Sequence, residues 1–278
     1  MKSVAASALV LFGLAACAGP GGISPSGGLM YRVPDTPSVV YLTESSQDIS
    51  LDVPGMGPMT IQGASTATLA LTFAPAEGGV QVTAAFDELT ASMDQPMAPL
   101  SATESDIVGE LVFVMDERGR GTVVSLPELR GSAEQLANPA GLVHSFFPRL
   151  PGGTAAPGET WTDTIKFDLQ TSTADASTQS ILTYTLVGDT VVDGADLLYV
   201  TYEGEMEAVT QADNQGMEMI QSFSGDVTGM FLWDPARGLM VFSESDEDLE
   251  GTTEIPAAGM APIPMTVRGT GWVRLQGG

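Results

Sequence analysis

The chain has 278 residues, of which 43% are hydrophobic, and its 10 lysine and arginine residues against 35 aspartate and glutamate residues give a net charge of −25. The hydrophobic share excludes an intrinsically disordered chain, since it is large enough to build a core. The acidity excludes nucleic acid and anionic lipid headgroups as partners of the surface as a whole, and it is typical of a solubilising surface.

The N-terminal segment has the organisation of a signal peptide. Residues 1–16 contain one cation, Lys2, an apolar run from Val4 to Leu14, and small residues that lead to Cys17. This apolar run is too short to span a membrane. Cys17 is the single cysteine of the sequence, whereas a secreted domain stabilised by disulfides would carry an even number. The alternative is an ordinary signal peptide in which the cysteine is incidental.

The four residues LAAC at positions 14–17 resemble the lipobox of bacterial lipoproteins. The resemblance implies cleavage before Cys17 after its thiol has received diacylglycerol, with palmitate-type acyl chains that hold the protein in a membrane. Each buried methylene of such chains contributes about 0.8 kcal/mol. Ala18, in place of an aspartate, implies sorting to the outer membrane. We therefore expect a lipid-anchored protein of the bacterial cell envelope that faces the periplasm.

Residues 17–33 are predicted to be the lipidated cysteine and a flexible tether, because AGPGGISPSGG is rich in Gly, Pro and Ser without a hydrophobic pattern. Residues 34–278 are long enough for a single large β domain. Within it, residues 69–73 alternate apolar with small or polar side chains, and Gly78-Gly79 leads to a second alternating run. This pattern predicts a hairpin with one buried face.

Similar strand patterns continue to the C-terminus. Turns at 116–119 (DERG) and 234–238 (DPARG) each join two apolar runs, with glycine available for a tight hairpin. These patterns predict a mainly β fold, with a large curved antiparallel sheet or half-barrel of about 11 or 12 strands. The segments expected to contribute to these strands are 38–42, 49–53, 69–73, 80–86, 107–115, 122–126, 161–169, 180–187, 197–209, 217–223, 228–233, 239–245 and 266–275.

A short helical insertion is predicted near residues 126–147. The sequence SLPE at 125–128 has the spacing of a capping box, with proline at the first helical position. Ser132 and Gln135 repeat that spacing, and the Asn-Pro pair at 138–139 separates two short helices. Such helices could lie across the mouth of an open sheet.

Two internal similarities suggest repetition. DIVG at 106–109 resembles DVTG at 226–229, and each precedes an apolar strand and a turn. This spacing is consistent with two related halves that flank the helices, or with the common use of Asp and Gly in curved hairpins. PMTIQG at 58–63 returns as PMTVRG at 264–269 with a different offset. The second pair predicts two strand starts near the two ends of one curved sheet.

Patterns that carry catalysis are missing from the sequence. It contains no Gly-x-Ser-x-Gly elbow, phosphate loop or His-Glu-x-x-His helix, and its one histidine, His144, is expected to pack within a helix. The acidic run at 246–251 resembles the start of a calcium loop, but the last ligand position falls on Ala257. We therefore expect no enzyme activity, cofactor or metal, and a solvated acidic hairpin end at this run.

Methionine pairs are the remaining unusual feature. Met56 with Met59, Met93 with Met97, and Met260 with Met265 lie close together in the sequence, as do residues 217 and 219. Thioethers bind Cu(I), but copper sites usually recruit His or Cys as well, and neither is near. The alternative is a flexible lining for an apolar core or lipid pocket.

A lipobox, a tether, about a dozen antiparallel strands and a small helical insertion together resemble the LolA/LolB and LppX/LprG group. That resemblance implies an incurved half-barrel that is covered by helices and holds acyl chains. The main hypothesis is accordingly a lipid-anchored, non-catalytic module that binds a hydrophobic ligand in a curved sheet. The alternatives are a structural or interaction lipoprotein with a filled core, and a hydrolase of envelope polymers with paired carboxylates.

Overall fold

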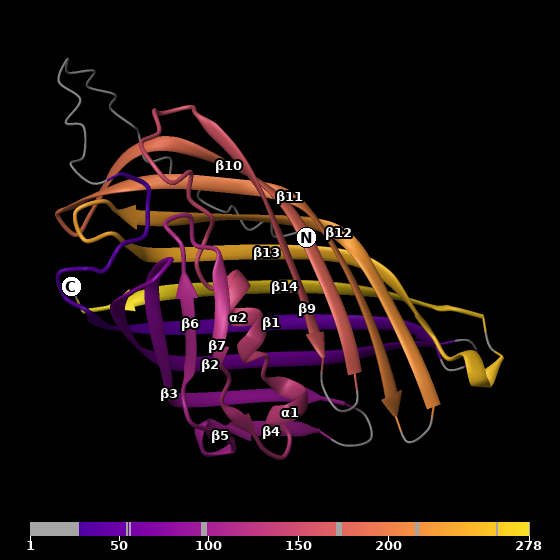
Figure 1. The fold of residues 1–278 in the computed structure, drawn as a ribbon. Coiled ribbons are helices and arrows are strands. Elements are labelled where there is room, and N and C mark those ends of the chain that lie inside the picture. The colour runs from indigo at the N-terminus through magenta and orange to yellow at the C-terminus, as the bar shows by residue number, and fades with distance from the viewer. Residues whose placement is uncertain are drawn as a thin grey trace, which may run out of the picture.

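The computed structural model describes residues 28–53, 55, 57–95, 99–170, 174–214, 217–259 and 261–277. Most of them belong to one curved, open antiparallel sheet with the strand order β7-β6-β3-β2-β1-β14-β13-β12-β11-β10-β9, to which β4 adds beside β3 (Figure 1). The predicted fold class is therefore confirmed. The strands are β1 (Ser38–Val53), β2 (Gly57–Ala76), β3 (Gly79–Asp94), β4 (Leu100–Thr103), β5 (Ile107–Val108), β6 (Leu111–Met115), β7 (Gly121–Ser125), β8 (Glu128–Leu129), β9 (Thr160–Gln170), β10 (Ala174–Val192), β11 (Ala195–Asn214), β12 (Met217–Asp234), β13 (Leu239–Glu254) and β14 (Ile263–Gln276).

Several strands are longer than their apolar patterns predicted. The segments 38–42 and 49–53 belong to one strand, β1, and the segments 217–223 and 228–233 belong to β12. The polar residues between them were not expected to be extended. They stay in the sheet because both strands are paired on both sides, so their backbone groups are satisfied regardless of side chain.

The two similar hexapeptides lie on either side of β1 in the same register. Ile61 in β2 and Val267 in β14 both face Ile49, and Gly63 and Gly269 both face Gln47. Each hexapeptide lies near the start of its strand, as predicted. The expectation that they mark the two ends of the sheet was wrong, because β14 returns to pair with β1 and places both copies at its centre.

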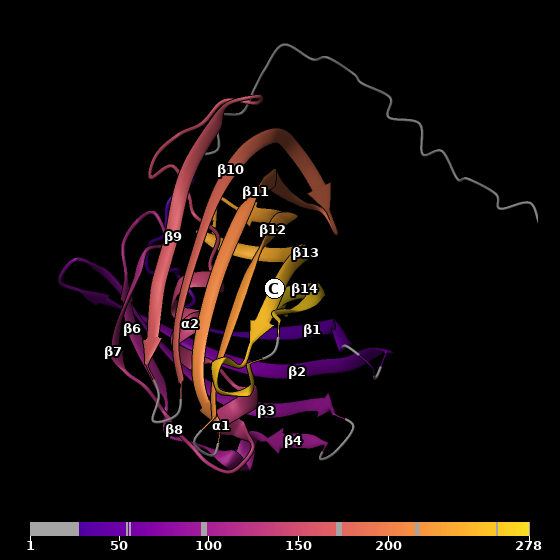
Figure 2. The same ribbon diagram turned by 90° about the vertical axis from the view of Figure 1, so that its right-hand side faces the viewer.

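Glycines allow neighbouring strands to approach closely where the sheet curves. A Cβ atom added at Gly204, Gly225 or Gly251 would collide with a backbone carbonyl oxygen of the adjacent strand. None of the three has a positive φ, so the lack of a side chain is what matters at these positions. The long strands β10 to β13 arch over the concave face, as Figure 2 shows.

The helices occupy a shorter segment than predicted. They are α1 (Ala133–Leu136) and α2 (Pro139–Ser145), with short 3-10 turns at Glu104–Asp106 and Pro256–Ala258. The capping box expected at 125–128 does not start a helix, because the end of that segment enters β8 and pairs with β5. Asn138 does cap α2, since its Oδ1 accepts a hydrogen bond from the Gly141 amide at 2.8 Å. Neither α1 nor α2 has the length and hydropathy of a membrane-crossing helix, nor has any other helix within the described ranges.

Aromatic side chains fill one end of the half-barrel. Phe147 makes edge contacts with Tyr31 and Tyr41, with ring centroids 5.4 and 6.4 Å apart, and Tyr31 also packs against Trp233 at 5.0 Å. Tyr31 precedes β1 and lies within the range predicted as tether. Residues 28–33 therefore belong to the folded domain, because Leu29 and Tyr31 are apolar enough to be buried in its core.

The outer strands of the sheet, β7 and β9, do not pair with each other, but nearby side chains connect the two sides. Asp163 in β9 is buried, and its Oδ2 lies 2.8 Å from Arg120 Nη2 and 3.8 Å from Arg118 Nη2, both in the turn between β6 and β7. Helix α2 also contacts both β7 and β9. One end of the half-barrel is thus closed by an ion pair and a helix, without a continuous hydrogen-bonded ladder.

Candidate ligand cavity on the concave face

An apolar cavity of about 270 Å³ lies between the helices and strands β1 to β3. Leu69, Phe86 and Leu89 line it from the sheet, and Leu142 lines it from α2. The alternation of the strands places these side chains on the concave face, where Ala67 leaves space that a larger residue would fill. The cavity can accept an apolar group in contact with these side chains.

Phe167 forms the β9 side of this cavity and packs against the predicted packing histidine. The rings of Phe167 and His144 are stacked, with centroids 5.0 Å apart and an interplanar angle of 6°. Burial and the nearby Arg149 guanidinium lower the pKa of His144, so its neutral form is favoured. His144 therefore contributes packing between α2 and β9, as the sequence predicted.

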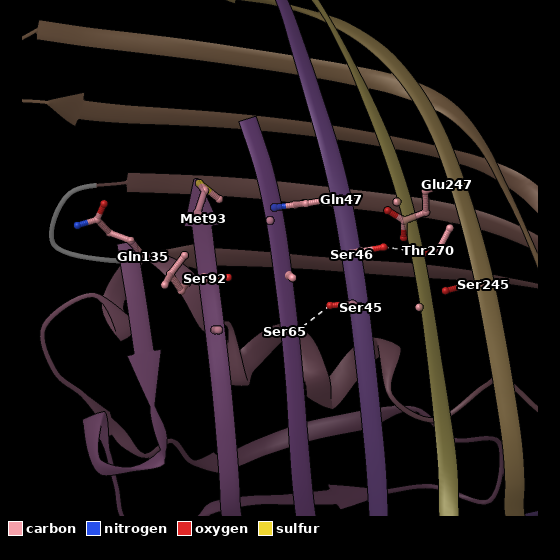
Figure 3. Close-up of a pocket in the computed structure, with 16 residues that line it drawn as sticks. Ser45, Ser46, Gln47, Ser65, Ser92, Met93, Gln135, Ser245, Glu247 and Thr270 are labelled. Carbon is pink, nitrogen blue, oxygen red and sulfur yellow. Dashed lines mark hydrogen bonds between the residues drawn. The ribbon is translucent and has the colours of Figure 1, made fainter. Parts of the chain in front are cut away.

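A polar groove of about 340 Å³ adjoins the apolar cavity along the concave face (Figure 3). Ser65, Ala91 and Leu136 line both spaces, which makes them neighbours. Ser45 and Gln47 contribute to the groove from β1, and the hydroxyls of Ser45 and Ser65 form a hydrogen bond of 2.8 Å. The lining changes from apolar near α2 to hydroxyl and amide groups further along the same strands.

Glycines on either side of β1 make room for two polar side chains. A Cβ atom added at Gly63 would lie 2.8 Å from Cγ and Nε2 of Gln47. One added at Gly269 would lie 3.3 Å from Oε2 of Glu247, which reaches the groove from β13. These two glycines belong to the repeated hexapeptides. Their small size thus lets Gln47 and Glu247 lie close to the floor of the groove.

Glu247 is the one carboxylate among the described residues that line this groove. It forms no hydrogen bond or ion pair within the part of the chain that the structure describes, and burial raises its pKa above the usual range. Its neighbours Asp246 and Asp248 point to the exposed convex face, where Asp248 lies 3.5 Å from Arg268. Glu247 is therefore a partly buried acid without a counter-ion.

A second charged group, Arg149, is buried in the filled end and lines neither space. Its Nη2 donates a 3.0 Å hydrogen bond to the His144 carbonyl, whereas Nε and Nη1 have no partner in the described structure. Burial lowers the pKa of Arg149, and the negative charge of Asp163 partly offsets this effect. The Arg149 carbonyl also accepts a 2.9 Å hydrogen bond from Trp161 Nε1, which ties the segment after α2 to β9.

Of the other positions that the sequence singled out, the acidic run lies within the described residues and Cys17 does not. Cys17 lies outside the described residues, and the predicted lipidation stays a prediction. The acidic run at 246–251 is the middle of β13, so it is neither the start of a calcium loop nor the end of a hairpin. Its side chains alternate between the two faces because the strand continues through it. No group of three or more His, Cys, Asp or Glu residues in the described ranges is arranged to hold a metal ion.

The methionines of the described chain do not gather at one point. Met59 and Met265 lie on either side of Leu51, and Met93 lines the polar groove. The Thr253 hydroxyl donates a 2.9 Å hydrogen bond to the Met265 sulfur. Met56, Met97 and Met260 lie outside the described residues. The arrangement is that of a dispersed lining, since the described thioethers are spread over separate strands.

Sequence reasoning did not single out Glu247, Gln47 or Ser65. The two-residue alternation of β13 contained a signal. Ser245, Glu247 and Leu249 lie on the same face of the strand, and Leu249 is buried opposite Val267. Extending that alternation through the acidic run would have assigned Glu247 to the concave face.

No protein-family model and no curated protein sequence matches the chain. Among solved structures, it is similar to DynF from the dynemicin biosynthesis pathway of Micromonospora chersina, with 8% identity over 90% of this chain and 86% of DynF and a TM-score of 0.26. A mutant porin of Rh. blastica has 8% identity over 86% of this chain and 99% of the porin, with a TM-score of 0.24. OccAB3 of Acinetobacter baumannii has 5% identity over the same shares and a TM-score of 0.21. Likenesses this weak carry no argument about function.

Proposed function

We propose that this chain is a non-catalytic, lipid-anchored protein of the bacterial cell envelope that shelters an acyl chain in the apolar cavity beneath α1 and α2. The anchor is the acylated Cys17, and the periplasmic face of the outer membrane is the proposed location. The observation that carries the proposal is an apolar cavity of about 270 Å³ on the concave face of an open sheet.

The shape of the two spaces favours a linear amphiphile over a compact apolar ligand. The apolar cavity adjoins the polar groove, so a ligand long enough to occupy both must be apolar at one end and polar at the other. Its binding energy would come from burial of the chain, at about 25 cal/mol per Å² of apolar surface. No reacting group is required for this function.

A fluorescence binding assay, with a probe that carries an alkyl chain and an uncharged head, tests this function. The full-length chain carrying Cys17→Ser should increase the fluorescence of the probe, and Ala67→Trp should abolish the increase because the indole fills the cavity. Thr66→Trp, on the exposed convex side of the same strand, should bind the probe like the parent. Equal binding by the two tryptophan variants would contradict the proposal.

A second candidate, a structural lipoprotein with a filled core, is favoured by the aromatic end of the half-barrel. There, the side chains of Tyr41, Phe147 and Trp233 are buried in one hydrophobic cluster. This candidate predicts that crosslinking in cells captures one stoichiometric envelope partner, and that neither tryptophan variant changes probe fluorescence. A carrier would instead yield no stoichiometric partner.

A further inference from the structure

We propose that the polar groove is a headgroup site for an amine-bearing, positively charged amphiphile, with Glu247 as the residue that pairs with the ammonium group. This inference rests on the proposed function, because the chain of the same ligand would occupy the apolar cavity. It adds the charge and hydrogen-bonding character of the head, which the apolar cavity alone does not specify.

The groove lies where the head of such a ligand would be. Its border with the apolar cavity is formed by Ser65, Ala91 and Leu136. Beyond them, the floor toward Glu247 consists mainly of small residues, with Gly269 and Gly271 on β14 and Ser45 on β1. A chain that leaves the apolar cavity along the sheet therefore reaches the Glu247 side chain without a bulky residue between.

The charges around the groove select against an anionic head. No lysine or arginine is among its described lining residues. Arg268 lies on the convex side, 3.5 Å from Asp248, and Arg274 packs over the Trp272 ring there at 5.5 Å from its centroid. A phosphate or carboxylate head would therefore meet Glu247 without any compensating cation, and like charges at this range repel.

An ammonium head would instead supply the counter-ion that Glu247 lacks. A partly buried carboxylate without a counter-ion is unfavourable, and this burial also raises the pKa of Glu247. An ammonium group has three donors, and the Glu247 carboxylate is an acceptor in the groove that no described side chain occupies. Charge-assisted hydrogen bonds of this kind are about twice as strong as neutral ones.

Three probes with the same alkyl chain separate the head from the chain. We expect the full-length Cys17→Ser protein to bind dodecylamine about tenfold more tightly than dodecanol, and dodecanoate most weakly, in calorimetric titrations at neutral pH below micelle-forming concentrations. Glu247→Gln should reduce dodecylamine affinity about tenfold, to the level of dodecanol, and leave dodecanol binding unchanged.

Glu250→Gln is the matched control, because Glu250 is three residues further along β13 and exposed on the convex side. It removes the same charge from the protein and should leave all three affinities unchanged, which separates the groove from general attraction by the acidic surface. The headgroup inference alone would be overturned if the amine and the alcohol bound with equal affinity, or if the two glutamine variants had equal effects. Tightest binding of dodecanoate would overturn it as well. Failure of all three probes to bind would overturn the proposed function together with it.

Discussion

Arg120 and Asp163 connect the two sides of the open sheet, with Nη2 of the arginine 2.8 Å from Oδ2 of the aspartate. Arg120 lies in the turn between β6 and β7, and Asp163 lies in β9, at the opposite end of the strand order. The side chain of Asp163 is only 2% exposed, whereas that of Arg120 is 50% exposed. The pair therefore joins a buried acid to a cation that keeps much of its hydration.

Asp163→Asn should lower the free energy of unfolding by about 1–3 kcal/mol, because it removes a charge-assisted hydrogen bond to a buried acceptor. Arg120→Gln should cost less, since Arg118 remains 3.8 Å from the same carboxylate. Urea unfolding monitored by circular dichroism measures both changes.

Asp168→Asn serves as the control for that series, because Asp168 is exposed on the same strand. Its substitution should change stability by no more than about 0.5 kcal/mol. If Asp163→Asn behaved like Asp168→Asn, the ion pair would not contribute to holding the two sides of the sheet together.

Gly251→Ala should destabilise the fold by about 1–3 kcal/mol, since the new methyl group would collide with the Ser222 carbonyl oxygen of the adjacent strand. Gly271→Ala is the matched substitution, because the nearest atom to its added Cβ would be 3.6 Å away. Thermal unfolding should show a clear loss for the first variant and little change for the second. Similar losses would mean that β-propensity, rather than close strand approach, requires glycine at 251.

Glu247 should make stability depend on pH in a direction set by its raised pKa. Because burial raises this pKa in the folded state, the folded protein holds the proton more tightly than the unfolded chain. The resulting stabilisation is present below the unfolded pKa of about 4.3 and is lost as pH rises through the folded pKa. Tyr202, the nearby acid whose pKa is raised to about 12, stays neutral throughout this range.

Urea unfolding of the parent and of Glu247→Gln at several pH values tests that direction. The stability of the parent relative to Glu247→Gln should fall between acidic and neutral pH, whereas the stability relative to Glu250→Gln should follow no such trend. A parent that gained stability over Glu247→Gln as pH rose would show that Glu247 has a favourable partner in the folded state.

Alternation of apolar residues was enough to predict the fold class, because a half-buried strand repeats its pattern every two residues. The hairpin at Gly78-Gly79 and the break between two short helices at Asn138-Pro139 followed from local chemistry alone. The relation between the two halves of the chain stays a prediction.

Long-range pairing accounts for most of what the sequence did not reveal. Ile61 and Val267 come to face the same residue only because β14 returns beside β1, and no local pattern specifies that return. Glu247 was hidden for a related reason. Its run of acidic neighbours resembles a loop until strands on both sides make it part of a continuous sheet.

Native mass spectrometry of the Cys17→Ser protein purified from bacterial cells tests the central claim most directly. If the apolar cavity shelters an acyl chain, the spectrum should contain a ligand-bound species whose added mass is released as lipid on organic extraction. That species should be lost in Ala67→Trp and retained in Thr66→Trp. Spectra that contain only ligand-free protein, with nothing lipid-like in the extract, would contradict the claim.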